Sequence, residues 1–155
     1  MTVMTDTSSS EFETLEKTHD NFATAPIEEA FNWDEFAKVT KLNEWYLVAF
    51  RSTRKPDADI AELEYLDEMA HQDAAGQPGY LFYYKGKIAE GSNHLHNLSF
   101  CMWTDRDSAK RAAMRSMHRQ ASEIALKMYE NYNLERYLGK IKREGDHPKV
   151  ELLAV

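Results

Sequence analysis

The pattern of hydrophobic and polar positions predicts a strand and then a helix near the middle of the chain. Residues 44–52, EWYLVAFRS, are rich in strand-forming residues and are apolar on both alternating faces. A strand wetted on one side alternates apolar with polar residues, so this strand is predicted to be covered on both faces. Residues 57–76 repeat apolar side chains at helical spacing, begin with an aspartate suited to capping and end at Gly76, which predicts a helix.

The same reasoning extends to the C-terminal half. A sequence resembling a capping box begins at Thr104 and predicts a long helix that continues to about Tyr129. Further strands are predicted at residues 79–86, 96–103, 134–144 and 149–155.

The N-terminal segment has a different composition. Residues 1–25 are polar, acidic and rich in Ser and Thr, with too little apolar surface to offset the entropy of ordering, so they are predicted to be disordered. An ordered domain is then expected over residues 26–155, opening with a short helix or two.

The order of these elements predicts a fold class. Strand, helix, strand, strand, helix, strand is the ferredoxin-like α+β arrangement, an antiparallel sheet with helices on one face. Because both faces of the first strand are apolar, the other face also needs a cover. A homodimer that places two sheets face to face, as a dimeric α+β barrel, would provide it.

Bulk composition narrows the function classes. The 155 residues suit one domain, and one cysteine fits a reducing cytoplasm. The first thirty residues hold seven acids and one lysine, which is −6 of the net −7, so the body of the chain carries about −1. A nearly neutral body argues against nucleic acid as a partner. No apolar run approaches a membrane span, and the N-terminus lacks the pattern of a secretory signal, so a cytoplasmic protein is expected.

Several segments carry a family resemblance. WYLVAFRSTRKPDAD, LDEMAH, GYLFYYKG, LSFCMW and MYENYNLERY together resemble a group of actinobacterial and fungal proteins of unknown function, over roughly residues 30–140. More distantly, the layout resembles the dimeric α+β barrel superfamily, which includes antibiotic biosynthesis monooxygenases and heme-degrading monooxygenases. This second resemblance concerns the fold and assigns no reaction.

Residues 97–103 form a two-faced strand. Leu98, Phe100 and Met102 are one alternating set, suited to packing under the helices. The other set is more polar and small-to-large, and is expected to face a cavity under the dimer cover: Asn97, Ser99, Cys101 and Trp103. The sequence alone leaves open which set points inward.

The resemblance suggests roles for some of these side chains. Cofactor-independent monooxygenases of the superfamily pair an Asn and a Trp beside an aromatic substrate, which implies Asn97 and Trp103 as catalytic candidates. The alternative is that Trp103 is core and Asn97 is a strand-end cap. The heme-degrading branch carries a histidine in its second helix, which implies His118 as an axial heme ligand. A border histidine bonded to a carbonyl or water is the alternative.

Other candidates come from their positions. His71 lies near the edge of the apolar face of the first helix, where it either joins a pocket as a catalytic residue or closes the helix end. His94 and His96 have a spacing that metals use, but no third ligand is evident, so no metal site is predicted. Ligand-binding candidates share an apolar or small polar side chain near the expected cavity: Tyr83, Ser99, Cys101, Met114 and Tyr129.

Three function hypotheses follow. The first is a small monooxygenase-like enzyme acting, without a cofactor, on an apolar or aromatic molecule in a cavity between the sheet and the helices. The second is a heme-binding protein that uses His118. The third is a non-catalytic dimeric binding or accessory protein whose aromatic residues form its interface.

Overall fold

A computed structural model describes residues 11–86, 95–143, 145 and 147–155, apart from the side chains of residues 116–118. Its elements follow in chain order: η1 (Phe22–Thr24), α2 (Ile27–Ala30), α3 (Trp33–Val39), β1 (Glu44–Arg54), α4 (Ile60–Ala75), β2 (Tyr80–Tyr84), β3 (His96–Trp103), α5 (Arg106–Ala113), α6 (Ser116–Leu126), β4 (Tyr129–Lys142) and β5 (Lys149–Ala154). Among the described helices, none combines the length and the apolar character needed to cross a membrane.

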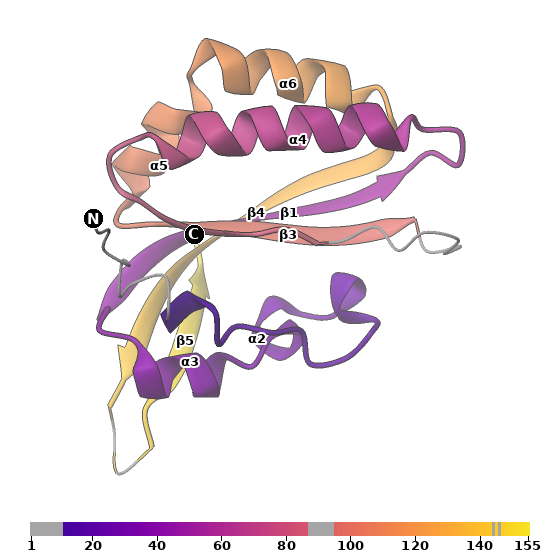
Figure 1. Cartoon of the computed structure of the whole chain (residues 1–155). Coiled ribbons are helices and arrows are strands. Elements are labelled where there is room, and N and C mark those ends of the chain that lie inside the picture. The colour runs from indigo at the N-terminus through magenta and orange to yellow at the C-terminus, as the bar shows by residue number, and fades with distance from the viewer. Residues whose placement is uncertain (1–10, 87–94, 144, 146) are drawn as a thin grey trace, which may run out of the picture.

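The strands form one antiparallel sheet in the order β2-β3-β1-β4-β5. With α4 between β1 and β2, and with α5 and α6 between β3 and β4, this is the ferredoxin-like α+β fold that the sequence predicts. The strand β1 lies at the centre of the sheet, between β3 and β4 (Figure 1). Its apolar residues on both faces therefore meet two different covers.

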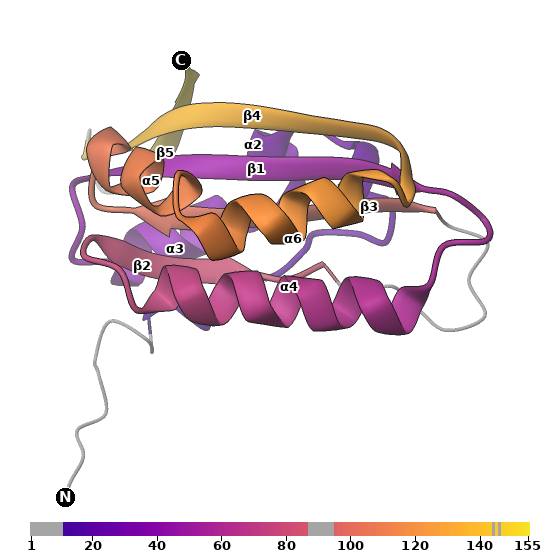
Figure 2. The same cartoon turned by 90° about the horizontal axis from the view of Figure 1, so that it is seen from above.

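One cover is a layer formed by α4, α5 and α6 (Figures 1 and 2). The predicted single helix after β3 is wrong, because the chain turns at Met114 and Arg115 and continues as α6. Arg115 has an extended backbone, and its guanidinium contacts the Asp73 carboxylate of α4 at 2.8 and 2.9 Å. This pairing ties the turn between α5 and α6 to the neighbouring helix.

The end of that helix also differs from the prediction. The helix α6 ends at Leu126, and Tyr129 already belongs to β4, where it pairs with Arg54. Because β1 extends to Arg54, its backbone groups need partners on the β4 side, and the residues from Tyr129 to Asn133 supply them. In this segment the apolar residues are spaced as in a helix, but hydrogen bonding of the backbone to β1 determines that it forms a strand.

The second cover is the N-terminal part of the same chain. Residues 11–40 run across the face of the sheet opposite to α4 and α6 (Figure 1). Phe12 is 1% exposed and stacks on Phe82 of β2 with ring centroids 5.0 Å apart. Phe31 and Trp33 contact Phe100 of β3 at 5.0 and 5.6 Å. Aromatic stacking thus joins this segment to the sheet.

This packing corrects two expectations. Disorder was predicted for residues 1–25, but Phe12, Leu15 and Phe22 are buried in the main core, and residues 1–10 lie outside the described residues. The low apolar content is offset because these few aromatic and aliphatic side chains all point to the sheet. The sheet face that was assigned to a partner subunit is covered by this segment instead, and the homodimer itself stays a prediction.

The N-terminal cover gives a stability prediction. Phe12→Ala should lower the free energy of unfolding by about 3–5 kcal/mol, because a buried ring is lost and a cavity remains. Urea unfolding followed by circular dichroism measures the change. Tyr65→Ala, at a side chain that is 62% exposed on α4, should change it by less than about 0.5 kcal/mol. Equal effects of the two substitutions would contradict the docking of this segment.

Candidate ligand-binding site

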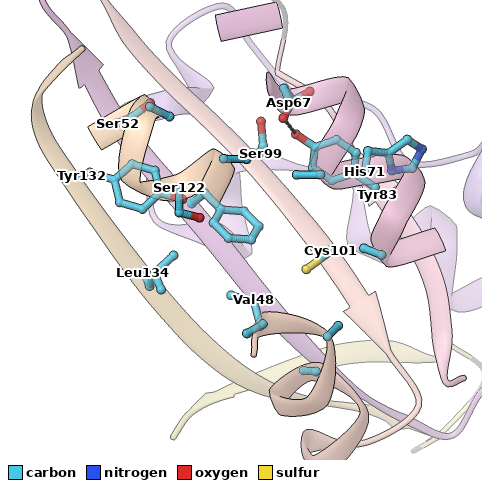
Figure 3. Close-up of a pocket in the computed structure, with 18 of the residues that line it drawn as sticks. Val48, Ser52, Asp67, His71, Tyr83, Ser99, Cys101, Ser122, Tyr132 and Leu134 are labelled. Carbon is cyan, nitrogen blue, oxygen red and sulfur yellow. Dashed lines mark hydrogen bonds between the residues drawn. The ribbon is translucent and has the colours of Figure 1, made fainter. Parts of the chain in front are cut away.

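A pocket of about 250 Å³ lies between the sheet and the layer of α4, α5 and α6. Its floor is the sheet face that carries the more polar set of β3, and Figure 3 shows part of its lining. The opposite set, Leu98, Phe100 and Met102, packs under the N-terminal segment. The expectation that this apolar set faces the helices is therefore wrong, while the polar set does line a cavity.

The floor of the pocket follows the strand register. Residues paired across β2, β3, β1 and β4 form rows about 6–7 Å apart along the strands. In order, the rows are Tyr80, Trp103 and Tyr46; then Tyr83, Cys101, Val48 and Arg136; then Ser99, Phe50 and Leu134; and last Asn97, Ser52 and Tyr132. Each row of the floor thus contains at least one aromatic side chain, and the small side chains of Cys101, Ser99 and Ser52 lie between them.

Alanine is the most frequent residue in the roof of the pocket. Where α4, α5 and α6 cross the sheet, they contribute Ala70, Ala74, Ala109, Ala112, Ala113, Ala121 and Ala125 to the lining. Large floor residues hold the helices away from the sheet, and a methyl group on the roof cannot fill the space between the layers. Protein interiors are normally close-packed. A void of this size therefore results from the small side chains of the roof.

Tyr83 is the centre of a polar cluster in the pocket. Its hydroxyl donates to Asp67 Oδ1 at 2.6 Å, and its ring lies 4.9 Å from the His71 ring. Asp67 and His71 are four residues apart and therefore share one face of α4. Figure 3 shows these three residues across the pocket from Tyr132 and Ser122. The site thus has two polar sides separated by an apolar centre.

Burial strongly affects the ionisable groups of the floor. Desolvation, followed by the charge of Asp67, raises the pKa of Tyr83, and desolvation raises the pKa of Tyr132. Burial raises the pKa of Tyr80 to about 12. Burial also raises the pKa of the Cys101 thiol to about 12, although Trp103 Nε1 donates to its sulfur at 3.1 Å. These groups are therefore neutral at physiological pH, and the floor carries hydroxyls and a thiol without charge.

The structure brings together only some of the predicted residues. Asn97 and Trp103 both line the pocket, but six residues of strand separate them, which is about 20 Å. A small ligand cannot contact both at one reacting atom, so the structure does not support their pairing. Asn97 also has a local role, because its amide packs against the backbone of Gly86, where any Cβ would come within 2.1 Å of Asn97 Oδ1.

The remaining candidates divide clearly. His71, Tyr83, Ser99, Cys101 and Tyr129 line the pocket. Met114 does not, because it lies in the turn after α5 and is 73% exposed.

The histidine candidates for heme and metal have different outcomes. The side chain of His118 and all of His94 lie outside the described residues, so the heme-ligand hypothesis stays a prediction. His96 Nδ1 lies 3.0 Å from Thr53 Oγ1 on the neighbouring strand. Within the part of the chain that the structure describes, no three His, Cys, Asp or Glu residues are placed to hold a metal ion.

Sequence reasoning missed Asp67, Ser52 and Tyr132. Asp67 could have been found from its spacing of four residues from His71 on a predicted helix. Tyr132 was hidden because residues up to 129 were assigned to a helix and the strand was expected to begin only at residue 134. Ser52 lies at the end of a mostly apolar predicted strand, and this pattern does not indicate that its hydroxyl lines a pocket.

Comparison with solved structures places the fold among known proteins. Proteins from Nitrosomonas europaea and Caulobacter crescentus CB15, both named "putative antibiotic biosynthesis monooxygenase", match with TM-scores of 0.53 and 0.51. The matches cover 66% and 61% of this chain and 94% and 88% of those proteins, at 10% and 16% identity. The likeness is one of fold, so the chain is a ferredoxin-like α+β protein whose architecture these two proteins share.

The family follows from the sequence comparison. Residues 3–151 match the model of the PB2B2.08-like family, and the chain belongs to this family. The UPF0643 protein PB2B2.08 of Schizosaccharomyces pombe is 29% identical over 97 residues, which is 59% of this chain and 43% of that protein. The matched region thus spans less than half the length of this relative.

The position of Cys101 gives a prediction about reactivity. Since its pKa is raised to about 12, the thiol stays protonated at about pH 8, and labelling by 5,5′-dithiobis(2-nitrobenzoic acid) should be slow in the native protein. Unfolding in urea should make it fast, because the pKa returns toward its ordinary value. Ala61→Cys on the exposed face of α4 adds a thiol that should react at once. Rapid labelling of native Cys101 would show that the site is open and its thiol ionised.

Proposed function

We propose that this protein binds a flat, largely apolar molecule of about two fused rings in the pocket between sheet and helices, and acts on it as a monooxygenase-like enzyme. The pocket itself carries the proposal. A cavity of about 150 Å³ lined by aliphatic and aromatic side chains holds benzene, so a cavity of about 250 Å³ suits a bicyclic molecule. The alanines of the roof and the uncharged tyrosines and thiol of the floor match an uncharged aromatic surface.

The reaction class follows the likeness in fold to the antibiotic biosynthesis monooxygenase type of structure. The position of each residue in the floor suggests its role toward the ligand. Trp103 and Asn97 would bound opposite ends of the ligand space, while Tyr83 and His71 stand beside its centre. In this proposal Trp103 shapes the pocket, and the polar contacts to the ligand come from the Tyr83 side.

Neutral floor groups set the electronic character of the site. The partly buried Cys101 thiol and Tyr80 phenol have raised pKa values and therefore add no negative charge beside the ligand. An electron-rich aromatic molecule that loses electrons to oxygen would therefore be held without like-charge repulsion from these groups.

Filling the roof tests the proposal. Ala70→Leu places three extra carbons in the pocket and should weaken the binding of 2-methoxynaphthalene, measured by calorimetric titration, by at least about tenfold. Ala61→Leu, on an exposed position of the same helix, should leave the affinity unchanged. Thermal unfolding of both variants controls for damage to the fold.

A second measurement addresses the reaction. Oxygen consumption with a panel of dihydroxynaphthalenes should exceed the uncatalysed rate for the wild-type protein and should fall for Ala70→Leu. The proposal fails as a whole if no bicyclic aromatic binds to the folded protein. If they bind and no oxygen is consumed, the binding function stands and the reaction class is wrong.

A further inference from the structure

The pocket holds two hydroxyl groups with hydrogen-bond partners in the protein, those of Ser99 and Tyr83. Ser99 Oγ accepts from the backbone N–H of Gly86 at 3.0 Å and from Asn97 Nδ2 at 3.4 Å. With both lone pairs in use, the Ser99 hydroxyl has its proton left to donate, and its hydrogen bonding acts on the pKa of Tyr83. Tyr83 in turn donates to Asp67 Oδ1 at 2.6 Å.

Asp67, which accepts the hydrogen bond from Tyr83, also lies beside a lysine. Asp67 Oδ2 is 3.5 Å from Lys85 Nζ, and Lys85 also pairs with Glu64 on α4. The Lys85 ammonium group offsets part of the negative charge of the Asp67 carboxylate. The Tyr83 hydroxyl donates to this carboxylate at 2.6 Å, so its proton is not free for a ligand.

The direction of the donors decides what the pocket offers to a ligand. Because the Tyr83 proton is donated to Asp67, Tyr83 presents an oxygen lone pair, and no free O–H, to the cavity. A ligand that donates a proton satisfies such a group, whereas an ether or carbonyl leaves it unsatisfied. A carboxylate at this place would also meet the negative charge of Asp67 one hydrogen bond away.

We infer that Tyr83, together with Ser99 and Asp67, is the hydroxyl-recognition group of the pocket, and that its ligands are aromatic alcohols or phenols rather than aromatic ethers or acids. This inference rests on the proposed function and names the substrate class of the same pocket. The ligand O–H donates to Tyr83 Oη, and the rings lie over Cys101 and Val48, the next residues in the same row of the floor.

Three probes of equal ring size test the inference: 2-naphthol, 2-methoxynaphthalene and 2-naphthoate. Calorimetric titration at neutral pH should show 2-naphthol binding about tenfold more tightly than 2-methoxynaphthalene, the expected effect of one well-placed hydrogen bond. The anion 2-naphthoate should bind more weakly than both. In Tyr83→Phe the ring is kept and the hydroxyl lost, so 2-naphthol and 2-methoxynaphthalene should bind equally well.

Two further variants separate recognition from general damage. Asp67→Asn removes the charge and should strengthen 2-naphthoate binding by about tenfold. Tyr132→Phe is the matched control, because it removes a tyrosine hydroxyl from the opposite side of the same pocket, and the preference for 2-naphthol should persist. Should Tyr83→Phe fail to fold by circular dichroism, Asp67→Ala takes its place: it frees the Tyr83 proton to donate to the ether oxygen, so the preference for 2-naphthol should fall.

The outcomes distinguish the two proposals. If wild-type protein binds 2-naphthol and 2-methoxynaphthalene equally, or Tyr83→Phe keeps the preference, the inference is overturned while the ligand-binding function stands. If none of the three probes binds, the proposed function fails and the inference fails with it.

Discussion

The apolar character of β1 on both faces is the constraint on which the rest of the structure depends. Tyr46 and Val48 point to the helices, and Trp45 and Leu47 point to the opposite side, so a single helix layer cannot remove both sets from water. The chain meets this demand with two covers of different kinds. Under the N-terminal cover, aromatic rings pack tightly against the sheet. Under the helix cover, alanines leave a cavity.

The contrast between the two covers explains why the pocket lies where it does. Phe12, Phe31 and Phe36 match the large side chains of the opposing strands, and this face is dense. Facing the helices, the large aromatic side chains of the floor set the distance between the layers, and the small side chains between them do not span it. Stability is thus concentrated on one face of the sheet, which allows the other face to keep a void beside polar groups.

Much of the fold could be predicted from the sequence, because strands and helices of this chain differ clearly in hydrophobic period. The element order, the two-faced strand 97–103 and its cavity-lining set all come from such local patterns. The N-terminal cover could not, since Phe12, Leu15 and Phe22 are spaced irregularly within a polar segment and gain their burial only from the sheet. Tyr132 was missed because β4 begins where the spacing still reads as helical.

The sequence predicts several residues of the pocket floor, but it does not predict which side chains contact one another. Alternation along β3 points to Ser99 and Cys101, but the bond between Tyr83 and Asp67 joins a strand to a helix sixteen residues earlier in the chain. Only the register of the sheet shows that Asn97 and Trp103, which look like neighbours in the sequence, occupy distant rows. Residue type alone does not show how far apart two side chains of one strand lie.

The N-terminal cover has a consequence for the order of folding. Phe12 and Phe31 are made early in synthesis, but the rings they pack against, Phe82 and Phe100, lie 70 and 69 residues further along the chain. Contacts between residues so far apart in sequence form slowly. The cover can therefore dock only after most of the sheet has been synthesised.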